Sequence, residues 1–394
     1  METEEAKLWS SEYIKVFIAN FSIFFSFMLL MPLLPIYLKE TFNADNDLIG
    51  VVLSGYVVMA LVSRGFSGYL VDSFPRKKVL VLSFFLFVLF FAGYLIPGTL
   101  LFFAIVRTLH GLPFGGATVA NSTIAIDVLH PSRRAEGIGF YGLSNNIATA
   151  ISPFVAMQIY HATQNYKLIF ALALATSAIG LIASCSVKLP KKELITNKAP
   201  ISLDRFFLLP AWRVAASLVC LSFSYGVVST YVAIYGQEKL GIEGGSGFFF
   251  ALLAIGLAMS RLVGSRSLRN GKVTHNAAVG CCISLLGYLV FAAGQNEFCY
   301  FGSALIVGLG NGHMFPAYQT MFINLAEHNQ RGTANSSLFV SWDVGVGLGI
   351  LVGGVVSRHY DYIAAFWCAW IINMIGVAIF FTLVKKFYEA HKLR

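Results

Sequence analysis

The sequence has very little charge for its length. Only 12% of its 394 residues are Asp, Glu, Lys or Arg, whereas an ordinary soluble domain has about 25%. Hydrophobic residues make up 57% of the chain, and the mean hydropathy is +0.72. Such a composition cannot cover a surface that faces water, so lipid must be the solvent for most of the chain. An ordinary soluble globular fold is therefore excluded.

The chain also lacks the residue groupings of a redox, metal or nucleotide site. Its six cysteines occur singly or as the pair Cys281-Cys282, without CxxC or Cys/His spacing, and we expect buried free thiols. The glycine-rich stretch 308–312 follows no predicted strand and precedes no P-loop Lys-Ser/Thr, so it is not a nucleotide site. We therefore expect no catalytic group, metal or cofactor. Any work that the protein does must draw on an ion gradient or on the gradient of its own ligand.

Long apolar runs make up most of the chain. A membrane-spanning helix needs about 20 apolar residues, and the sequence contains twelve such runs. Their approximate ranges are 13–36, 47–70, 79–96, 99–126, 137–160, 166–187, 213–236, 246–265, 275–294, 298–324, 334–357 and 362–384. Continuous runs such as 79–91 differ from the alternating segments of a membrane β-barrel. The sequence therefore predicts an all-α membrane protein with twelve transmembrane helices.

Basic residues are unevenly distributed between the two sides of the expected membrane. If the N-terminus is cytoplasmic, 21 of the 28 Lys and Arg residues fall in inner loops and termini. The outer loops hold Lys39, Lys167, Lys239 and Arg358, and the expected helices hold Arg64, Arg107 and Arg261. Residues 1–5 are acidic, unlike the start of a cleavable signal peptide. The positive-inside rule then predicts a multi-pass protein of the cytoplasmic (inner) membrane with both termini cytoplasmic, and no binding of nucleic acid.

The two halves of the chain resemble each other. The longest polar interval, 188–212, separates a first bundle of six helices (1–187) from a second (213–394). The stretch HPSRRA before the fifth run is matched by HNQRGT before the eleventh, and Ser63-Arg64 is matched by Ser260-Arg261. Two similar bundles imply a pseudo-two-fold axis along the membrane normal, with a substrate site between them near the midplane.

Several motifs resemble those of the major facilitator superfamily, over essentially the full length of the chain. The signature between its second and third helices is carried by Gly68, Leu70, Asp72, Arg76 and Lys77, and the helix-4 signature by Arg107, Gly111 and Gly115. The pattern of its drug:proton antiporters is met by Pro32-Leu33-Leu34-Pro35 and partly by Gly137, Gly142 and Ser152-Pro153. The chain departs from these patterns at Pro75, Ala148 and Ala156, where glycine is usual. The loop 265–272 also lacks the acidic residue of its counterpart between the second and third helices.

A conformational switch is expected around the polar interruption 68–78. Asp72 and Arg76 are four residues apart, so they share one face of a helical turn, and Asp127 ends the fourth run at the same surface. The resemblance implies that Asp72 faces the start of the eleventh helix and that Arg76 pairs with Asp127. With Gly68, these residues would lock the cytoplasmic side and stabilise an outward-open state. The alternative is that the basic residues only orient the segment and that Asp72 is solvated.

Asp343 is the acidic residue that lies well inside a spanning run. It follows the start of that run by nine residues and therefore lies roughly 13 Å deep. At such a depth an ionised carboxylate costs at least about 2.5 kcal/mol. At the repeat offset its counterpart is Asn145, next to Asn146. We expect these side chains to line a cavity, with Asp343 as a proton site or a partner for a cationic substrate. A structural carboxylate bonded to a neighbouring helix is the alternative.

Arg107 and two histidines are further candidates for the cavity. The resemblance implies that Arg107 assists proton movement or holds an anion, whereas a buried ion pair between helices is the alternative. His110 lies one turn beyond Arg107, and His313 lies near the equivalent depth of the tenth run. Histidine titrates in the physiological range, so either could couple transport to protons, or each could be a hydrogen-bonded packing residue.

Together these observations predict a monomeric secondary transporter that works by alternating access. Its expected partners are a small-molecule substrate, protons as coupling ion and the lipid bilayer, and its expected activity is proton-coupled efflux of a small organic molecule or drug. A sugar or organic-acid facilitator or symporter is the alternative. A membrane enzyme is disfavoured because the spans hold no Ser/His/Asp group, metal-ligand cluster or carboxylate pair. A receptor without transport is a third alternative.

Overall fold

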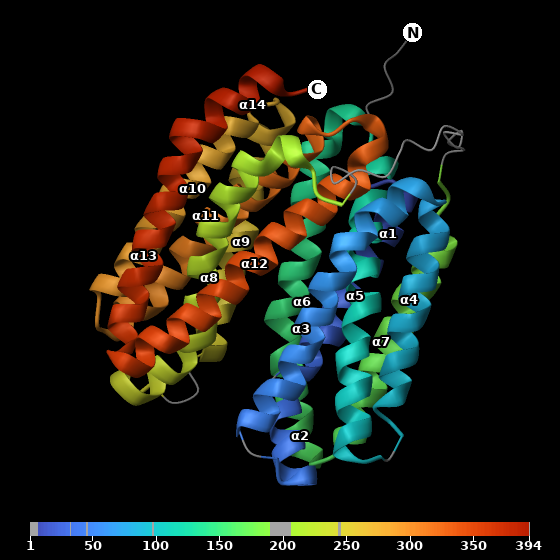
Figure 1. Cartoon of the computed structure of the whole chain (residues 1–394), viewed down its shortest axis with the longest axis vertical. Helices are drawn as coiled ribbons and strands as arrows, with labels where there is room; N and C mark the ends of the chain where they lie inside the picture. The colour runs from blue at the N-terminus through green and yellow to red at the C-terminus, as the bar shows by residue number, and fades with distance from the viewer. Residues whose placement is uncertain are drawn as a thin grey trace. The chain divides into compact units, whose positions relative to one another are not determined.

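The computed structural model describes residues 7–31, 33–44, 46–96, 98–189, 206–242 and 246–393, and helices account for most of them (Figure 1). No strand occurs in these ranges. The chain divides into two compact units, each of which is described by itself. Unit 1 comprises Met1–Gly137, Ser144–Phe207 and Asn329–Ser336, and unit 2 comprises Ile138–Leu143, Leu208–His328 and Ser337–Arg394.

Unit 1 contains the helices drawn from blue to green in Figure 1. They are α1 (Ser11–Leu30), α2 (Leu33–Phe42), α3 (Asn46–Ser73), α4 (Arg76–Gly93), α5 (Leu100–Val128), α6 (Arg134–Thr163) and α7 (Tyr166–Ser186). The segment Ile138–Leu143 of α6 is the exception, because it belongs to unit 2. α3 packs along α5, α1 packs along α7, and α4 contacts both α5 and α7. The connection between α3 and α4 lies at the end of α3 opposite to α2 (Figure 1).

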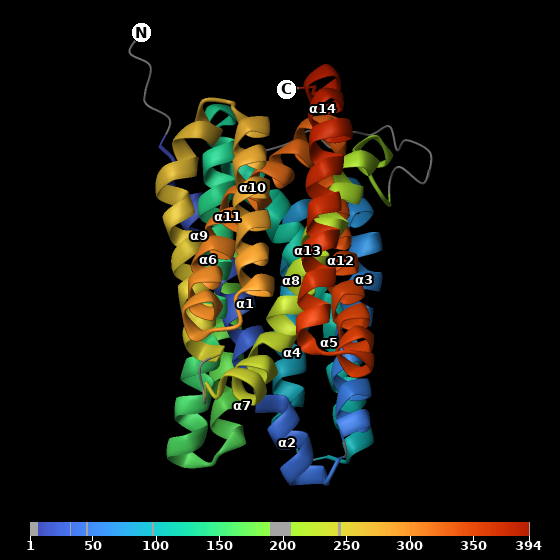
Figure 2. The same ribbon diagram turned by 90° about the vertical axis from the view of Figure 1, so that its left-hand side faces the viewer.

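Unit 2 contains the helices drawn from yellow-green to red. They are α8 (Trp212–Leu240), α9 (Ser246–Arg269), α10 (Val273–Ala293), α11 (Glu297–Leu325), α12 (Arg331–His359), α13 (Tyr362–Ile379) and α14 (Lys385–His391). α11 packs between α9 and α10, and α13 packs on α8 and α10. A π-helical segment, Phe380–Val384, joins α13 to α14, which continues in nearly the same direction (Figure 2).

Each of the twelve expected apolar runs overlaps one long helix in the described part of the chain. Eight helices there are long and apolar enough to cross a membrane. The expected first run, 13–36, is wrong at its end, because α1 stops at Leu30 and α2 begins at Leu33. Pro32 lies outside the described residues, but a proline cannot donate the backbone hydrogen bond that a continuous helix needs. Residues 190–205, which make up most of the expected linker 188–212, also lie outside the described residues.

Side-chain caps fix where several helices begin. Ser10, Thr99, Asn165, Asn296 and Asp361 each precede a helix and accept a hydrogen bond from a backbone N–H of its first turn. These N–H groups have no partner inside the helix, so the cap satisfies donors that would otherwise need water. Short loops with such caps keep successive helices antiparallel within each unit.

Glycines let helices within a unit approach until their backbones touch. A Cβ atom on Gly111 of α5 would overlap the carbonyl oxygen of Tyr56 in α3, and one on Gly115 would overlap that of Ala60. Small residues four apart give this close approach in membrane helices. The glycine spacing therefore positions α5 against α3, and with it the polar residues that both helices carry.

The same constraint generates a prediction within α11. A Cβ on Gly308 would overlap the carbonyl oxygen of Leu253 in α9, whereas one on Gly302 would have nothing within 4 Å. We expect Gly308→Ala to destabilise the protein by about 1–3 kcal/mol through overpacking. The control Gly302→Ala is expected to be neutral or to stabilise by up to about 1 kcal/mol. Thermal unfolding in detergent measures both, and equal melting temperatures for the two variants would contradict the close approach.

Candidate functional site

The connection between α3 and α4 brings a charged cluster to one end of unit 1. α3 ends at Ser73, Pro75 occupies the N-cap position of α4, and Arg76 is the first residue of α4. Proline suits this position because the start of a helix needs no backbone donor there. The tight turn leaves Arg76 Nη2 3.2 Å from Asp72 Oδ1.

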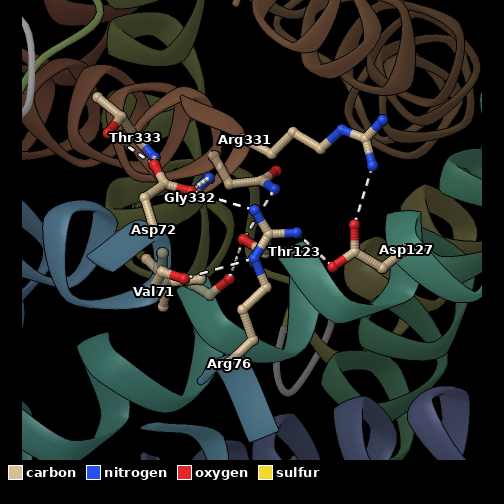
Figure 3. A network of polar contacts seen from close by, with 10 residues as sticks. Val71, Asp72, Arg76, Thr123, Asp127, Arg331, Gly332 and Thr333 are labelled. Carbon is tan, nitrogen blue, oxygen red and sulfur yellow. Dashed lines mark hydrogen bonds and ion pairs between the residues drawn. The ribbon is translucent and has the colours of Figure 1, made fainter. Parts of the chain in front are cut away.

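Asp72 binds the first turn of α12. Its Oδ1 accepts a hydrogen bond from the backbone N–H of Gly332 at 2.8 Å, and its Oδ2 accepts from the N–H and the hydroxyl of Thr333 at 2.9 and 3.0 Å (Figure 3). The carboxylate is 1% exposed. The start of a helix has unsatisfied N–H groups and a partial positive charge, so it is a natural anion site. Here a side chain of α3 occupies that site.

Gly68 allows this contact because it has no side chain that would block the approach of α12 to α3. It lies one turn before Asp72 on α3, and a Cβ there would be 2.8 Å from Thr333 Cα and 2.9 Å from Ser336 Cβ. Real Cβ atoms essentially never come so close to a backbone atom, so any larger residue would push the start of α12 away. The glycine is needed for close approach rather than for backbone flexibility.

Two arginines and two aspartates alternate through the rest of the cluster (Figure 3). Arg76 Nη1 donates to Asp127 Oδ2, and its Nε donates to the carbonyl oxygen of Val71 at 3.4 Å. The other carboxylate oxygen of Asp127, Oδ1, accepts from Arg331 Nη1 at 2.9 Å. The order is therefore Arg331, Asp127, Arg76, Asp72 and then the start of α12.

The cluster is nearly dry and electrically balanced. Side-chain exposure is 1% for Asp72, 8% for Arg76, 14% for Asp127 and 3% for Arg331. Removing charges from water is costly, and the cost is recovered only when each charge is paired and its hydrogen bonds are satisfied. The two positive and two negative side chains pair with one another here, and loss of one member would leave a buried charge without its partner.

A second row of contacts continues along the next turn of α12. The Asn335 side chain donates to the Thr123 hydroxyl at 3.2 Å and accepts from the Ser122 hydroxyl at 3.0 Å. The hydroxyl of Ser336 donates to the carbonyl oxygen of Arg64. Hydrogen bonds to α3 and α5 therefore hold the segment Asn329–Ser336 in unit 1, although the rest of α12 belongs to unit 2.

Sequence reasoning missed Arg331, which bonds the second oxygen of Asp127. A signal was present, because Arg331 lies in the repeated stretch 328–333 and corresponds to Arg133 in 130–135. Arg133, which ends the 3-10 turn 131–133, instead contacts Glu136 in the first turn of α6 at 2.7 Å. The repeat identifies equivalent positions, but it cannot show that one copy pairs locally and the other across helices.

Arg107 and His110 lie one turn apart on α5 in an aromatic surrounding. The guanidinium of Arg107 lies over the ring of Tyr56, with Cζ 4.1 Å from its centroid. His110 is fully buried, and its Nδ1 lies 2.9 Å from the hydroxyl of Tyr94. The ring of Tyr56 also contacts His110, with centroids 5.5 Å apart. The structure thus brings both candidates into contact with one tyrosine.

The asparagine pair of α6 lies elsewhere in unit 1. Asn145 and Asn146 are partly buried, and Asn145 Oδ1 accepts a hydrogen bond from the Thr149 hydroxyl one turn later, at 3.1 Å. Among the residues that the structure describes, neither contacts Arg107. A shared cavity of these three residues stays a prediction.

The candidates of unit 2 lie on α11 and α12. Asp343 is partly buried and follows Trp342, whose ring contacts Tyr225 at 5.5 Å and Phe315 at 5.2 Å between centroids. His313 is 5% exposed, and its Nδ1 lies 2.9 Å from a carbonyl oxygen one turn earlier on α11. The aromatic contacts are those of Trp342, while the histidine lies at the packed side of its helix.

No group of three or more His, Cys, Asp or Glu residues in the described ranges could hold a metal ion. The six cysteines are free. The expectation of buried thiols is wrong for Cys185 and Cys282, which are exposed on their helices. A thiol behaves as a small apolar group, so an apolar helix surface tolerates it.

The carboxylate of Asp127 lies between Arg76 and Arg331, so its removal should cause a large loss of stability. We expect Asp127→Asn to destabilise the protein by about 3–5 kcal/mol, because Arg76 and Arg331 both lose their shared anion. Glu12→Gln is the control, because Glu12 pairs with Lys15 at 2.8 Å where both side chains are about a quarter exposed, and such pairs contribute about 1 kcal/mol or less. Unfolding in detergent measures the loss of stability of both variants. Equal losses would show that the buried ion pairs of the cluster contribute no more than an exposed pair.

Curated relatives span the whole chain at low identity. The staphylopine export protein of Staphylococcus aureus is 23% identical over 384 residues, which cover 93% of this chain and 94% of that protein. The quinolone resistance protein NorA of Staphylococcus aureus is 22% identical over 396 residues, covering 95% and 97%. The maltose permease of Geobacillus stearothermophilus is 24% identical over 377 residues, covering 93% of each chain.

Solved structures share the fold. The human organic anion transporter MFSD10 (TETRAN) superposes with a TM-score of 0.80 at 15% identity, covering 94% of this chain and 99% of the other. The transporter FucP in the outward conformation gives a TM-score of 0.77 at 15% identity, covering 97% and 99%. The sequence itself matches the family profile over residues 16–345 and 276–393. This chain is a multi-pass membrane transporter and belongs to the Major Facilitator Superfamily.

Proposed function

We propose that this secondary transporter exports a small organic molecule in exchange for protons by alternating access. The observation that carries the proposal is the attachment of the first turn of α12 to the connection between α3 and α4. From Ser337 onward, α12 belongs to unit 2. A movement of unit 2 that carries α12 with it would have to break these contacts, and they can re-form when it returns.

The strength of the contacts suits such a switch. Hydrogen bonds to charged groups contribute about 1.5–3 kcal/mol each, and states that exchange during function differ by a few kcal/mol. Asp72, Arg76, Asp127 and Gly68, joined by Arg331, would therefore favour the state in which the start of α12 is held. We assign this state to the outward-open form, with the cluster and both termini on the cytoplasmic side of the inner membrane.

The direction of transport and the substrate class rest on the relatives. Two of them are named for export or drug resistance, and the pattern Pro32 to Pro35 is similar to that of drug:proton antiporters. The second candidate is a sugar or organic-acid facilitator or symporter, which the likeness to a maltose permease supports at equal coverage. Everted vesicles distinguish the two, because an antiporter releases protons from the vesicle lumen when substrate enters, whereas a symporter takes protons up with it.

For the cavity we propose Asp343 as the protonation site. Arg107, Asn145, Asn146, His110 and His313 are the other candidates to line the path of substrate or protons. A protonated Asp343 is neutral and an ionised one is charged, so binding and release of a proton would change how it interacts with substrate. The protein is proposed to work as a monomer.

The switch predicts that Asp72→Asn impairs transport. The amide cannot provide the charge that binds Gly332, Thr333 and Arg76, so we expect initial rates to fall about tenfold or more at equal surface expression. Asp361→Asn is the control, since Asp361 also accepts from a helix N–H, that of Ala364, but caps only its own helix. Unchanged transport by Asp72→Asn would refute the switch.

The proton site predicts a loss of pH dependence. We expect Asp343→Asn to bind substrate but to show transport that no longer responds to an imposed pH gradient, whereas Asp343→Glu keeps the response. Flux into everted vesicles with and without the gradient measures both variants. Full pH-dependent transport by Asp343→Asn would show that the proton binds elsewhere.

A further inference from the structure

The continuous helix formed by α13, the π-helical segment and α14 is longer than the hydrocarbon core of a membrane. From Tyr362 to His391 it has 30 residues, which correspond to about 45 Å at the usual rise, whereas the core is about 30 Å thick. The helix carries no charged residue from Tyr362 to Val384, and Lys385 and Lys386 follow directly. The excess length therefore places α14 among the lipid headgroups.

Positive side chains outnumber negative ones at this level. Residues 385–392 include three lysines and one acidic residue, Glu389. Glu389 already has partners, because its carboxylate accepts from Lys392 Nζ and from the Thr274 hydroxyl at 2.8 and 2.7 Å. Lys385 and Lys386 are exposed. Their charges therefore exceed what the carboxylate of α14 can balance.

Arg213 of α8 adds a further positive charge beside α14. Its guanidinium lies over the ring of Phe387, which follows Lys386, with Cζ 4.2 Å from the centroid. The centroid of the Trp212 ring lies 5.0 Å from the same atom. Aromatic faces attract a cation, but they carry no net charge, and no ion pair of Arg213 occurs in the described part of the chain. The guanidinium is therefore held in place without being neutralised.

Exposed apolar side chains border these cations. Leu383, one turn before Phe387, is 47% exposed, and Trp212 is 52% exposed. Leu209, in the 3-10 turn before α8, is 48% exposed. Tryptophan is typical of the boundary between hydrocarbon and headgroups, because its ring is apolar and its N–H is polar. Cations next to exposed apolar groups fit an amphiphile with an anionic head better than a free ion.

Contacts within unit 2 fix the position of α14. The Asn324 side chain donates to the hydroxyl of Tyr388 at 2.7 Å, and the carbonyl oxygen of Asn324 accepts from the N–H of Leu393 at 2.9 Å. Together with the hydrogen bond from Thr274 and the ring contact of Arg213, these bonds attach the segment to α8, α10 and α11. The protein itself therefore sets where the lysines of α14 lie relative to Arg213.

We propose that this surface, formed by Arg213, Lys385 and Lys386 with Trp212 and Leu383, binds an anionic phospholipid. The headgroup phosphate accepts hydrogen bonds from the guanidinium and the two lysines, and an acyl chain lies along the exposed apolar side chains. The cytoplasmic leaflet, where we place the C-terminus, attracts basic segments next to a spanning helix because its lipids carry negative charge. The inference goes beyond the proposed transport function and does not depend on it.

Tryptophan fluorescence of the full-length protein in lipid nanodiscs tests the lipid preference. Nanodiscs of phosphatidylcholine receive the same mole fraction of phosphatidylglycerol or phosphatidylcholine with brominated acyl chains, which quench only rings in contact with them. The difference between the unchanged protein and Trp212→Phe isolates the signal of Trp212. We expect the anionic lipid to quench this signal about threefold more strongly, because it concentrates beside the cations. Equal quenching by both lipids would overturn the proposal.

Matched lysine variants, each measured with and without Trp212→Phe, locate the effect. Lys385→Gln/Lys386→Gln is expected to remove most of the preference for the anionic lipid. Lys167→Gln/Lys239→Gln removes the same net charge from two lysines that are exposed elsewhere, and it should keep the preference. An undiminished preference in the first variant would overturn the proposal. So would an equal loss in both variants, since the preference would then follow net charge alone.

A water-soluble analogue distinguishes the lipid from a free phosphate. Glycerol 3-phosphate has a headgroup phosphate without acyl chains, and sodium chloride of the same ionic strength is its control. The analogue is expected to displace no more brominated phosphatidylglycerol than the salt does, because acyl chains contribute to binding. Full displacement by the analogue, with the salt ineffective, would identify a site for free phosphates and overturn the proposal.

Discussion

The contact on which the arrangement of unit 1 most depends is the binding of one carboxylate to the start of one helix. Asp72 accepts two backbone N–H groups of α12, and a glycine one turn earlier on α3 permits the approach. Arg76 and Asp127 then extend the contact to α5. Because every partner is charged or carries a helix dipole, the interaction is strong without being permanent. The switch that we propose for this contact requires this combination.

Two groups of arginines in unit 1 differ in what balances them. Arg76 and Arg331 are neutralised by carboxylates of the protein itself. Among the residues that the structure describes, the guanidinium of Arg107 meets the face of Tyr56 and no carboxylate. The first group can hold elements together without a ligand, since its charges already sum to zero.

The hydropathy pattern predicted the helices well, because lipid requires long apolar segments with internally satisfied backbones. The division between α1 and α2 was missed, because a proline is apolar and leaves the hydropathy of a run unchanged, although it has no backbone N–H to donate. For the site, spacing and resemblance brought Asp72, Arg76 and Asp127 together. Tyr56 carried no signal, because its contact with Arg107 depends on how α3 packs on α5 rather than on any spacing along the chain.

The wide separation of partners in the charged cluster has a consequence for biosynthesis. Asp72 and Gly332 are 260 residues apart, so the nascent chain carries two aspartates and Arg76 long before Arg331 leaves the ribosome. Until then the cluster has a surplus negative charge, and Asp72 has no helix end to bind. The N-terminal half must therefore wait, inserted but incompletely packed, for the second half to be synthesised. Chains released early would expose this defect to membrane quality control.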